Sequence, residues 1–446
     1  MQIVKAHTDF WSCYTTEMNS PRAPFVGVLS NRPFFFLWLG QILSQISINM
    51  VLFILGLIVY KNTGSNTAVS GIFIAYGVPA VLFGMPAGTI VDFVEKRLII
   101  FYSCILRALF VFGLLILGKS IPMVYALLFL NALVTQLYVP AEATLIPLLV
   151  GKNFIVSANS LFSFAYYGSM VIGFIAAGPV LKVFGPVASL TILALLFTLS
   201  AWTATKLPSQ RDGHIEFFRR FIHLDIRTIW TKVIQSLASG AAYVRQSPVL
   251  FDAVLLLTGT QITFAMLGTL GPGFADRVMN IDVTDASLVI IGPVMAGLLA
   301  GIAWVGYKGS RISPHFLMRT GILGAGAILT AVSTSVYLMR FPKLDSLYDS
   351  PWLIGIEMVL FFLLGMFNSF IDVPANSILQ KSAKGEMRGR VYGVLAAFVG
   401  GVGILPVLIG GVLADTIGVG KVIFLLGIAI IFYGMYRIRY NKIANG

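Results

Sequence analysis

Hydrophobic residues in this chain are gathered in long runs that short polar stretches separate. Each run has about twenty residues or more, the length of helix that crosses the apolar core of a bilayer. Such runs predict membrane-spanning helices, because a helix satisfies all of its backbone polar groups within its own segment. Twelve predicted helices cover approximately residues 34–60, 67–91, 98–118, 122–147, 157–181, 184–206, 249–275, 284–307, 315–338, 352–379, 389–414 and 420–437.

The polar stretches between the runs predict how the helices are oriented. Positive charge in short loops resists translocation, so the side richer in lysine and arginine is expected to be cytoplasmic. If both termini are cytoplasmic, only seven of the 31 basic residues fall on the outer side, namely Lys61, Lys119, Lys182, Arg277, Arg340, Lys343 and Lys421. This asymmetry favours an even number of spans in a cell (inner) membrane.

The longest polar stretch lies between the sixth and seventh runs. It places Arg219, Arg220, Arg227 and Lys232 among bulky apolar residues, which is typical of an amphipathic helix on an anionic leaflet; a solvated linker is the alternative. The predicted organisation is a cytoplasmic tail (1–30), a six-helix half (31–206), a cytoplasmic linker (207–248), a second six-helix half (249–440) and a tail (441–446).

The two halves repeat one another in sequence. Val139-Pro140-Ala141 in the fourth run recurs as Val373-Pro374-Ala375 in the tenth, at an offset of 234 residues. Gly178 and Gly185 recur as Gly411 and Gly418, at an offset of 233. A nearly constant offset indicates duplication. Two related halves around a central path suit alternating access.

A charged loop joins the second and third runs. Its pattern consists of Gly88, Asp92, Lys96 and Arg97, with Phe93 where an arginine would complete it. A carboxylate beside helix N-termini and basic residues could hold one face of a bundle closed. A loop that only sets the topology is the alternative.

Glycines and a proline mark the fifth run. Gly168, Gly173, Gly178 and Pro179 permit close helix contact and a bend. With the charged loop and the twelve runs, they resemble the major facilitator superfamily from Asn31 to about Tyr440, in particular its drug and siderophore exporters of the macrolide efflux and enterobactin exporter type. The resemblance implies an all-α fold of two pseudo-symmetric six-helix bundles. It also implies that the loop holds the cytoplasmic face closed. Gly173, Gly178 and Pro179 would belong to an antiporter signature, although general helix packing would explain these glycines too.

Polar residues inside the runs are the candidate path and coupling residues. Arg107 lies deep in the third run, where insertion of a charge costs about 2.5 to 3.5 kcal/mol; a structural role and substrate contact are both open. Fourfold spacing places two polar sets each on one face of a helix, in the first and tenth runs. These sets, with path positions implied by the resemblance, are Gln41, Gln45, Asn49, Asn368, Asp372 and Asn376, then Thr135, Tyr138, Thr258 and Gln261.

Two of the acids occupy related positions. Aligning Pro140 with Pro374 places Asp372 opposite Tyr138, one turn from Glu142. Because desolvation disfavours a charged carboxyl, Asp372 and Glu142 are expected to load and release protons. A fixed ion pair, for instance with Arg107, is the alternative. Glu357 and Asp252 are expected near the membrane interfaces.

Composition excludes other classes of protein. Hydrophobic residues make up 57% of the chain and charged residues only 11%, against about 25% charged in soluble domains. The net charge of +13 includes no basic run interleaved with aromatics, so nucleic acid is not an expected partner. Motifs of intramembrane enzymes, metal sites and phosphate-binding loops are lacking, which predicts no enzyme activity and no cofactor. The two cysteines, Cys13 and Cys104, predict no disulfide framework.

The expected function is therefore a monomeric secondary transporter in contact with membrane lipid. It would export a small drug, siderophore or metabolite, with protons as the coupling ion. An importer on the same fold, or a receptor that does not transport, remains the alternative.

Topology is the first testable prediction. Reporter fusions after Ser209 and at Gly446 should both give a cytoplasmic signal, because the linker and the C-terminus lie on the positively charged side. A fusion after Lys119, in a predicted outer loop, serves as the control and should report the opposite side. An outer signal at Ser209 or Gly446 would contradict the twelve-helix arrangement.

Overall fold

The computed structural model describes residues 24–151, 154–209, 226–339, 351–383 and 387–444. Over these residues the chain is helical, without strands. The helices of the first half are α2 (Pro24–Leu29), α3 (Arg32–Thr63), α4 (Asn66–Phe93), α5 (Lys96–Leu117), α6 (Ile121–Leu149) and α7 (Ile155–Ala204). Those of the second half are α10 (Pro248–Arg277), η2 (Val283–Asp285), η3 (Ser287–Ile291), α11 (Gly292–Lys308), η4 (Gly309–Arg311), α12 (Pro314–Met339), α13 (Pro351–Ser382), α14 (Met387–Ala397), η6 (Phe398–Val402), α15 (Ile404–Ile417) and α16 (Val419–Ala444).

The predicted helices match the observed ones. Eleven segments of the described chain are long and apolar enough to cross a membrane. One of them, the 50-residue α7, turns at Gly185, whose φ of 74° breaks the helix. It therefore contains both the fifth and the sixth predicted helices. Gly418, at the predicted repeat position, has a φ of 99° and joins α15 to α16. Because positive φ favours glycine, the same residue makes the same tight turn in each half.

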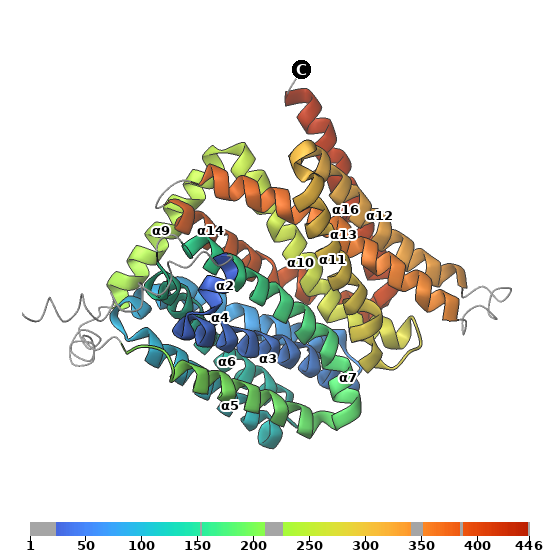
Figure 1. Ribbon diagram of the computed structural model, residues 1–446. Coiled ribbons are helices and arrows are strands. Elements are labelled where there is room, and N and C mark those ends of the chain that lie inside the picture. The colour runs from blue at the N-terminus through green and yellow to red at the C-terminus, as the bar shows by residue number, and fades with distance from the viewer. Residues whose placement is uncertain (1–23, 152–153, 210–225, 340–350, 384–386, 445–446) are drawn as a thin grey trace, which may run out of the picture.

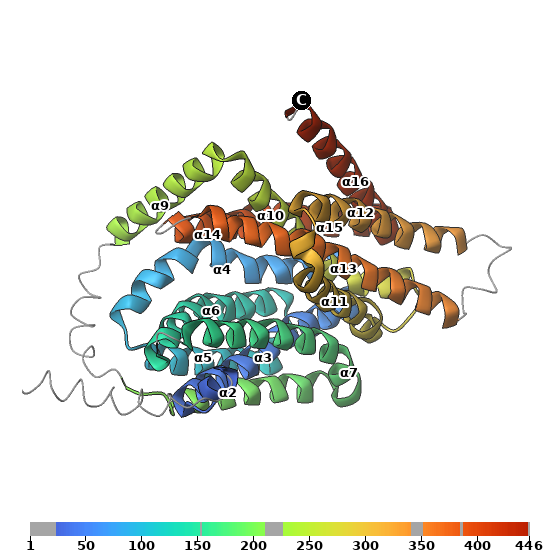
Figure 2. The same ribbon diagram turned by 45° about the horizontal axis from the view of Figure 1, so that its top comes forward.

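The two halves lie side by side as separate bundles. In Figures 1 and 2 the helices coloured blue to green form one bundle and those coloured yellow to red form the other. Within the first bundle, α3 packs along α7; within the second, α11 packs along α13. Between the bundles, α4 packs against α15 and α10.

Glycines allow the closest helix crossing in the second half. A methyl group at Gly365 of α13 would overlap the carbonyl of Val294, and one at Gly297 of α11 would overlap the carbonyl of Phe362. Small residues at such crossings let two backbones approach, which is how helices associate without a hydrophobic driving force.

The described part of the linker forms α9 (Ile226–Gln246) and packs on the second half. Gly240 lies against the carbonyl of Arg390 in α14, and the Arg390 guanidinium donates to Ser239 at 3.1 Å. The Tyr243 hydroxyl donates to the carbonyl of Ser382 at 3.1 Å. Neither sequence-based alternative for the linker included this docking. The side chains of Arg219, Arg220, Arg227 and Lys232 lie outside the described part of the structure.

Polar side chains join the two halves at the end of the molecule opposite α9, which we call the latch face. The end that carries α9 is the linker face, where α4 also packs against α9 and α14. At the latch face, Asp415 in the last turn of α15 caps the N-terminus of α4. Its carboxylate accepts from the backbone N–H groups of Asn66 and Thr67, at 2.8 and 2.9 Å. It also accepts from the Ser65 and Thr67 hydroxyls and the Asn66 amide, at 2.6 to 2.9 Å. A carboxylate in this position satisfies helix N–H groups that lack a partner in their own helix and complements the helix dipole.

Further polar contacts surround this cap. Arg277 of α10 donates to the carbonyl of Gly64, and the Tyr60 hydroxyl donates to Asp276 at 3.1 Å. Lys61 lies 3.4 Å from Asp282. The hydroxyl and backbone N–H of Thr284 lower the pKa of Asp282 to about 2, against an ordinary value of 3.8. A lowered pKa means that this contact is complete at neutral pH and is lost only on strong acidification.

A related contact joins the halves through α7 and the start of the eighth span. Lys182 of α7 pairs with Asp285 at 2.7 Å. Gly178, one turn earlier, packs so closely on Thr284 and Ser287 that no larger residue would fit. Lys182 and Asp415 are 233 residues apart, the offset of the sequence repeat. The latch face is therefore closed by two pseudo-symmetric contacts.

The Asp415 cap can be tested by measuring distances between the halves. In a background with Cys13 and Cys104 replaced by alanine, spin labels at positions 119 and 421 would report on the latch face. Asp415→Asn leaves an amide that cannot accept from five donors, so we expect the distance distribution to shift to longer values. Thr416→Val is the control, because the Thr416 hydroxyl bonds only within its own helix. An unchanged distribution in Asp415→Asn would show that the cap does not hold the face closed.

The helix crossing at Gly365 can be tested by thermal unfolding in detergent. We expect Gly365→Ala to cost about 1 to 3 kcal/mol, because the backbone of α11 must move to admit a methyl group. Gly355→Ala on the same helix is the control, since nothing lies within 4 Å of an added Cβ there. Equal melting temperatures would contradict this interpretation of the crossing.

Candidate functional site

A buried cation occupies the centre of the first half. Arg107 of α5 is 1% exposed, and its Nη1 donates to the Ser44 hydroxyl of α3 at 2.5 Å. The guanidinium lies over the ring of Tyr138 of α6, 4.3 Å from the ring centroid, and 5.6 Å from the centroid of Phe197 of α7. Such cation–π contacts stabilise a desolvated guanidinium. Arg107 thus ties together all four of these helices.

Tyr138 connects this cation to a carboxylate. Its hydroxyl donates to Glu142 Oε1 at 3.0 Å, one turn along α6. Tyr138 and Glu142 are 3% and 7% exposed. The direct Glu142–Arg107 ion pair that the sequence left open is not formed; the phenol lies between the two groups. Three of the predicted candidates are therefore brought together, and Glu142 is held by a neutral donor.

The second half has its own carboxylate at the repeat-related place. The Thr260 hydroxyl of α10 donates to Asp372 Oδ1 of α13 at 3.0 Å and also contacts the carbonyl of Leu257 at 2.9 Å. Asn376 donates to the carbonyl of Asp372 at 3.2 Å. Asn368 is 4% exposed, and its Oδ1 has no hydrogen-bond partner in the described part of the chain. The polar face predicted for this helix is thus turned toward α10.

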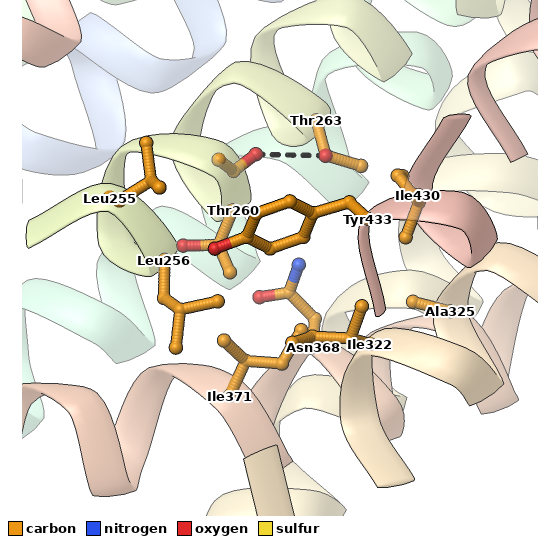
Figure 3. Close-up of a pocket in the computed structure, with 11 residues that line it drawn as sticks. Leu255, Leu256, Thr260, Thr263, Ile322, Ala325, Asn368, Ile371, Ile430 and Tyr433 are labelled. Atoms are coloured by element: carbon orange, nitrogen blue, oxygen red, sulfur yellow. Dashed lines mark hydrogen bonds between the residues drawn. The ribbon is translucent and has the colours of Figure 1, made fainter. Parts of the chain in front are cut away.

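A cavity adjoins Asn368. It measures about 210 Å³ and lies among α10, α12, α13 and α16. Figure 3 shows Tyr433 reaching across it toward Thr260, with the amide of Asn368 beneath the ring. Apart from these side chains and Thr263, whose hydroxyl bonds to the carbonyl of Gly259, the walls are aliphatic.

The polar residues predicted on one face of α3 differ in their surroundings. Gln41 is 6% exposed and its Oε1 has no partner within the described residues, whereas Gln45 is half-buried. Asn49 donates to the carbonyl of Gln45 at 2.7 Å and packs against Gly173. The other path candidates also differ: the Thr135 and Thr258 hydroxyls are buried and bond within their own helices, while Gln261 is exposed.

The loop motif lies on the linker face. Gly88 has open space around its Cα, and Lys96 and Arg97 are half-buried at the start of α5. The side chain of Asp92 is outside the described residues, so its role in closing this face stays a prediction. Sequence reasoning missed Glu95, which is 7% exposed and accepts from the Ser209 hydroxyl at 2.9 Å.

The two glycines of the antiporter-like motif, Gly173 and Gly178, have different surroundings. Gly173 allows α7 to approach the carbonyl of Ile46 in α3, so helix packing within the first half accounts for it. Gly178, followed by Pro179, lies where the first half meets the second. Only Gly178 is therefore placed to affect how the halves move.

The two acids expected near the membrane interfaces, Asp252 and Glu357, have structural partners. Asp252 pairs with Arg437 and ties α10 to α16. Glu357 was expected near an interface, but it is fully buried between α12 and α13 and accepts from the Ser335 hydroxyl. Its depth in the membrane stays a prediction, whereas its burial against α12 was not predicted, because the position along a helix does not say which neighbour faces it.

Several polar residues that matter here carried no sequence signal. Ser44 and Thr260 are small hydroxyl residues of a kind found in most of the spans, and only their partners, Arg107 and Asp372, give them a role. Asn131 of α6 is 2% exposed, and neither of its side-chain polar atoms has a partner in the described part. It lies one turn before Thr135, so helical spacing could have identified it.

Comparison with solved structures agrees with the architecture. The nucleoside transporter NupG is 13% identical, with a TM-score of 0.67 over 91% of this chain and 99% of that one. The POT family transporter PepTSo is 14% identical, with a TM-score of 0.66 over 95% of this chain and 98% of that one. At such identity the likeness concerns the fold alone.

Comparison by sequence gives relatives of nearly the same length. An uncharacterized MFS-type transporter, YfiS of Bacillus subtilis, is 25% identical over 89% of both chains. The multidrug efflux pump Tap of Mycolicibacterium fortuitum is 22% identical over 85% of this chain and 89% of its own. Macrolide efflux protein A of Streptococcus pyogenes is 21% identical over 92% of this chain and 96% of its own. The sequence model of the Major Facilitator Superfamily matches residues 37–406, and with the twelve-span, two-bundle fold this shows that the chain is a transporter that belongs to that superfamily.

Proposed function

We propose that this transporter exports a small organic molecule by alternating access, in exchange for protons. Export is supported by the names of two relatives, a multidrug efflux pump and a macrolide efflux protein. The proposed substrates are accordingly amphipathic or apolar molecules of the drug, siderophore or metabolite class.

The observation that carries proton coupling is the pair of carboxylates on the fourth helix of each half. Glu142 and Asp372 each accept a hydrogen bond from a neutral hydroxyl, that of Tyr138 or Thr260. In the described part of the chain, neither is ion-paired. Because no ion pair has to be broken, each can take up and release a proton with a small change in its partners. Ionisable groups inside membrane spans commonly mark ion pathways and proton relays.

The closed latch face defines the proposed conformation. With the linker face in the cytoplasm, the two contacts of Asp415 and Lys182 close the outer side, and we propose that in this state the transporter accepts its substrate from the linker face. Export then requires both contacts to break as the linker face closes. The loop from Gly88 to Arg97 is on that face, and we propose that Asp92 forms the closing contact there.

Coupling can be tested in proteoliposomes with and without an imposed pH gradient, using a substrate identified by screening a deletion strain against antibiotics, dyes and siderophores. We expect Asp372→Asn to reduce gradient-driven transport to the rate seen without a gradient, while exchange down a substrate gradient persists. Glu142→Gln should act in the same direction. The reason is that an amide cannot carry the proton, whereas the helices can still alternate.

Glu357→Gln is the matched control for this experiment. Glu357 is also a buried carboxylate on α13 with a serine donor, but it is sealed between two helices at 0% exposure. We expect this variant to respond to the gradient as the parent does. If Asp372→Asn and Glu142→Gln also respond like the parent, neither carboxylate carries the coupled proton.

A further inference from the structure

The cavity among α10, α12, α13 and α16 lies inside the second half, where the ninth span contributes Ile322 and Ala325. In the first half, the corresponding first, third, fourth and sixth helices bring Ser44, Arg107, Tyr138 and Phe197 together around a buried cation. The cavity, about 210 Å³ in volume, therefore lies where the two halves carry different side chains.

The size of the cavity limits what it can hold. A cavity of about 150 Å³ with apolar walls binds benzene, whereas pockets for whole drug-sized molecules measure about 300 to 1,000 Å³. About 210 Å³ therefore suits one substituted ring. Aliphatic side chains such as Leu256, Ile371 and Ile430 form the walls, and the ring of Tyr433 offers a face for stacking.

Asn368 supplies a polar group at this apolar site. Its amide points into the cavity beneath Tyr433 (Figure 3), and the side chain is 4% exposed with its Oδ1 unpartnered. A buried polar group without a partner costs about 1 to 3 kcal/mol. A ligand that carries a hydroxyl or an amide can both donate to and accept from this group, and would remove that cost.

We infer that this cavity is a binding site, inside the second half, for an uncharged ring that bears a hydroxyl or amide group. The absence of a basic residue among the lining side chains distinguishes it from the Arg107 cluster. The site deepens the proposed function, because it would hold the ring end of the substrate. That the ligand is the transported substrate rests on the proposed function, whereas binding of the ring does not depend on it.

The site also adjoins the proposed proton carrier. Thr260 forms part of the cavity wall, and its hydroxyl donates to Asp372. A ligand that displaces Thr260 changes the hydrogen bond to that carboxylate. Occupancy of the cavity and protonation of Asp372 are in this way linked through one side chain.

Photolabelling of the purified full-length protein in lipid nanodiscs tests the site. The probe is 4-azidophenol, a single ring with one hydroxyl, and labelled peptides are mapped by mass spectrometry. We expect saturable labelling of peptides that contain Leu256, Ile371 or Tyr433, competed by 4-ethylphenol. 4-Azidoanisole, which cannot donate, should need an about threefold to tenfold higher concentration, the factor for one lost hydrogen bond.

Two variants and one control make the test specific. Ala325→Phe fills the cavity and should reduce the saturable labelling about tenfold or more. Asn368→Leu should abolish the preference for 4-azidophenol over 4-azidoanisole while leaving the cavity able to hold a ring, which keeps the test valid if Ala325→Phe folds poorly. Ala327→Phe, an exposed position on the same helix, should label like the parent.

The outcomes separate this inference from the proposed function. Non-saturable labelling spread over lipid-facing helices, or saturable labelling that Ala325→Phe leaves unchanged, would overturn the site. No pH gradient is used in these measurements. Labelling as expected together with a failed gradient experiment would support the site and contradict only proton coupling. A successful gradient experiment without the expected labelling would contradict the site and leave proton coupling supported.

Discussion

A polar group in a bilayer has to find its partner inside the protein, and this constraint shapes every level of the structure. It makes each span a helix, because only a helix satisfies its own backbone. It draws Arg107 to Ser44 and Tyr138, and Asp372 to Thr260. Each of these side chains would be costly if it faced lipid, so its partner fixes which helices are neighbours.

The same constraint explains how two bundles can be joined and still separate. The N–H groups at the start of α4 have no partner in their own helix, and Asp415 of the other bundle supplies one. Lys182 and Asp285 form the repeat-related contact. Both lie at a face where water can replace the lost partners when the halves move apart. Hydrogen bonds at the membrane boundary can therefore hold a face closed and still allow it to open.

Some buried polar side chains do not meet this constraint. Asn368 and Gln41 are buried, with side-chain oxygens that have no partner in the described chain. One adjoins a cavity, and the other belongs to the polar face of the first span. The first half places a cation and aromatic rings among the helices that correspond to those lining the cavity beside Asn368 in the second half. The two halves thus differ in their chemistry at related places of the fold.

The hydrophobic runs predicted the spans, and the recurring prolines and glycines predicted two related halves, because both patterns can be read along the chain. The turns that Gly185 and Gly418 make with positive φ appeared only in the fold. The sequence also identified Arg107 and Asp372 as polar groups in apolar runs. Their partners became apparent only from the packing of the helices. A helix periodicity gives the face on which a residue lies but not the helix that meets it, so the phenol between Arg107 and Glu142, the burial of Glu357 and the Asp415 cap depended on how helices far apart in sequence pack together.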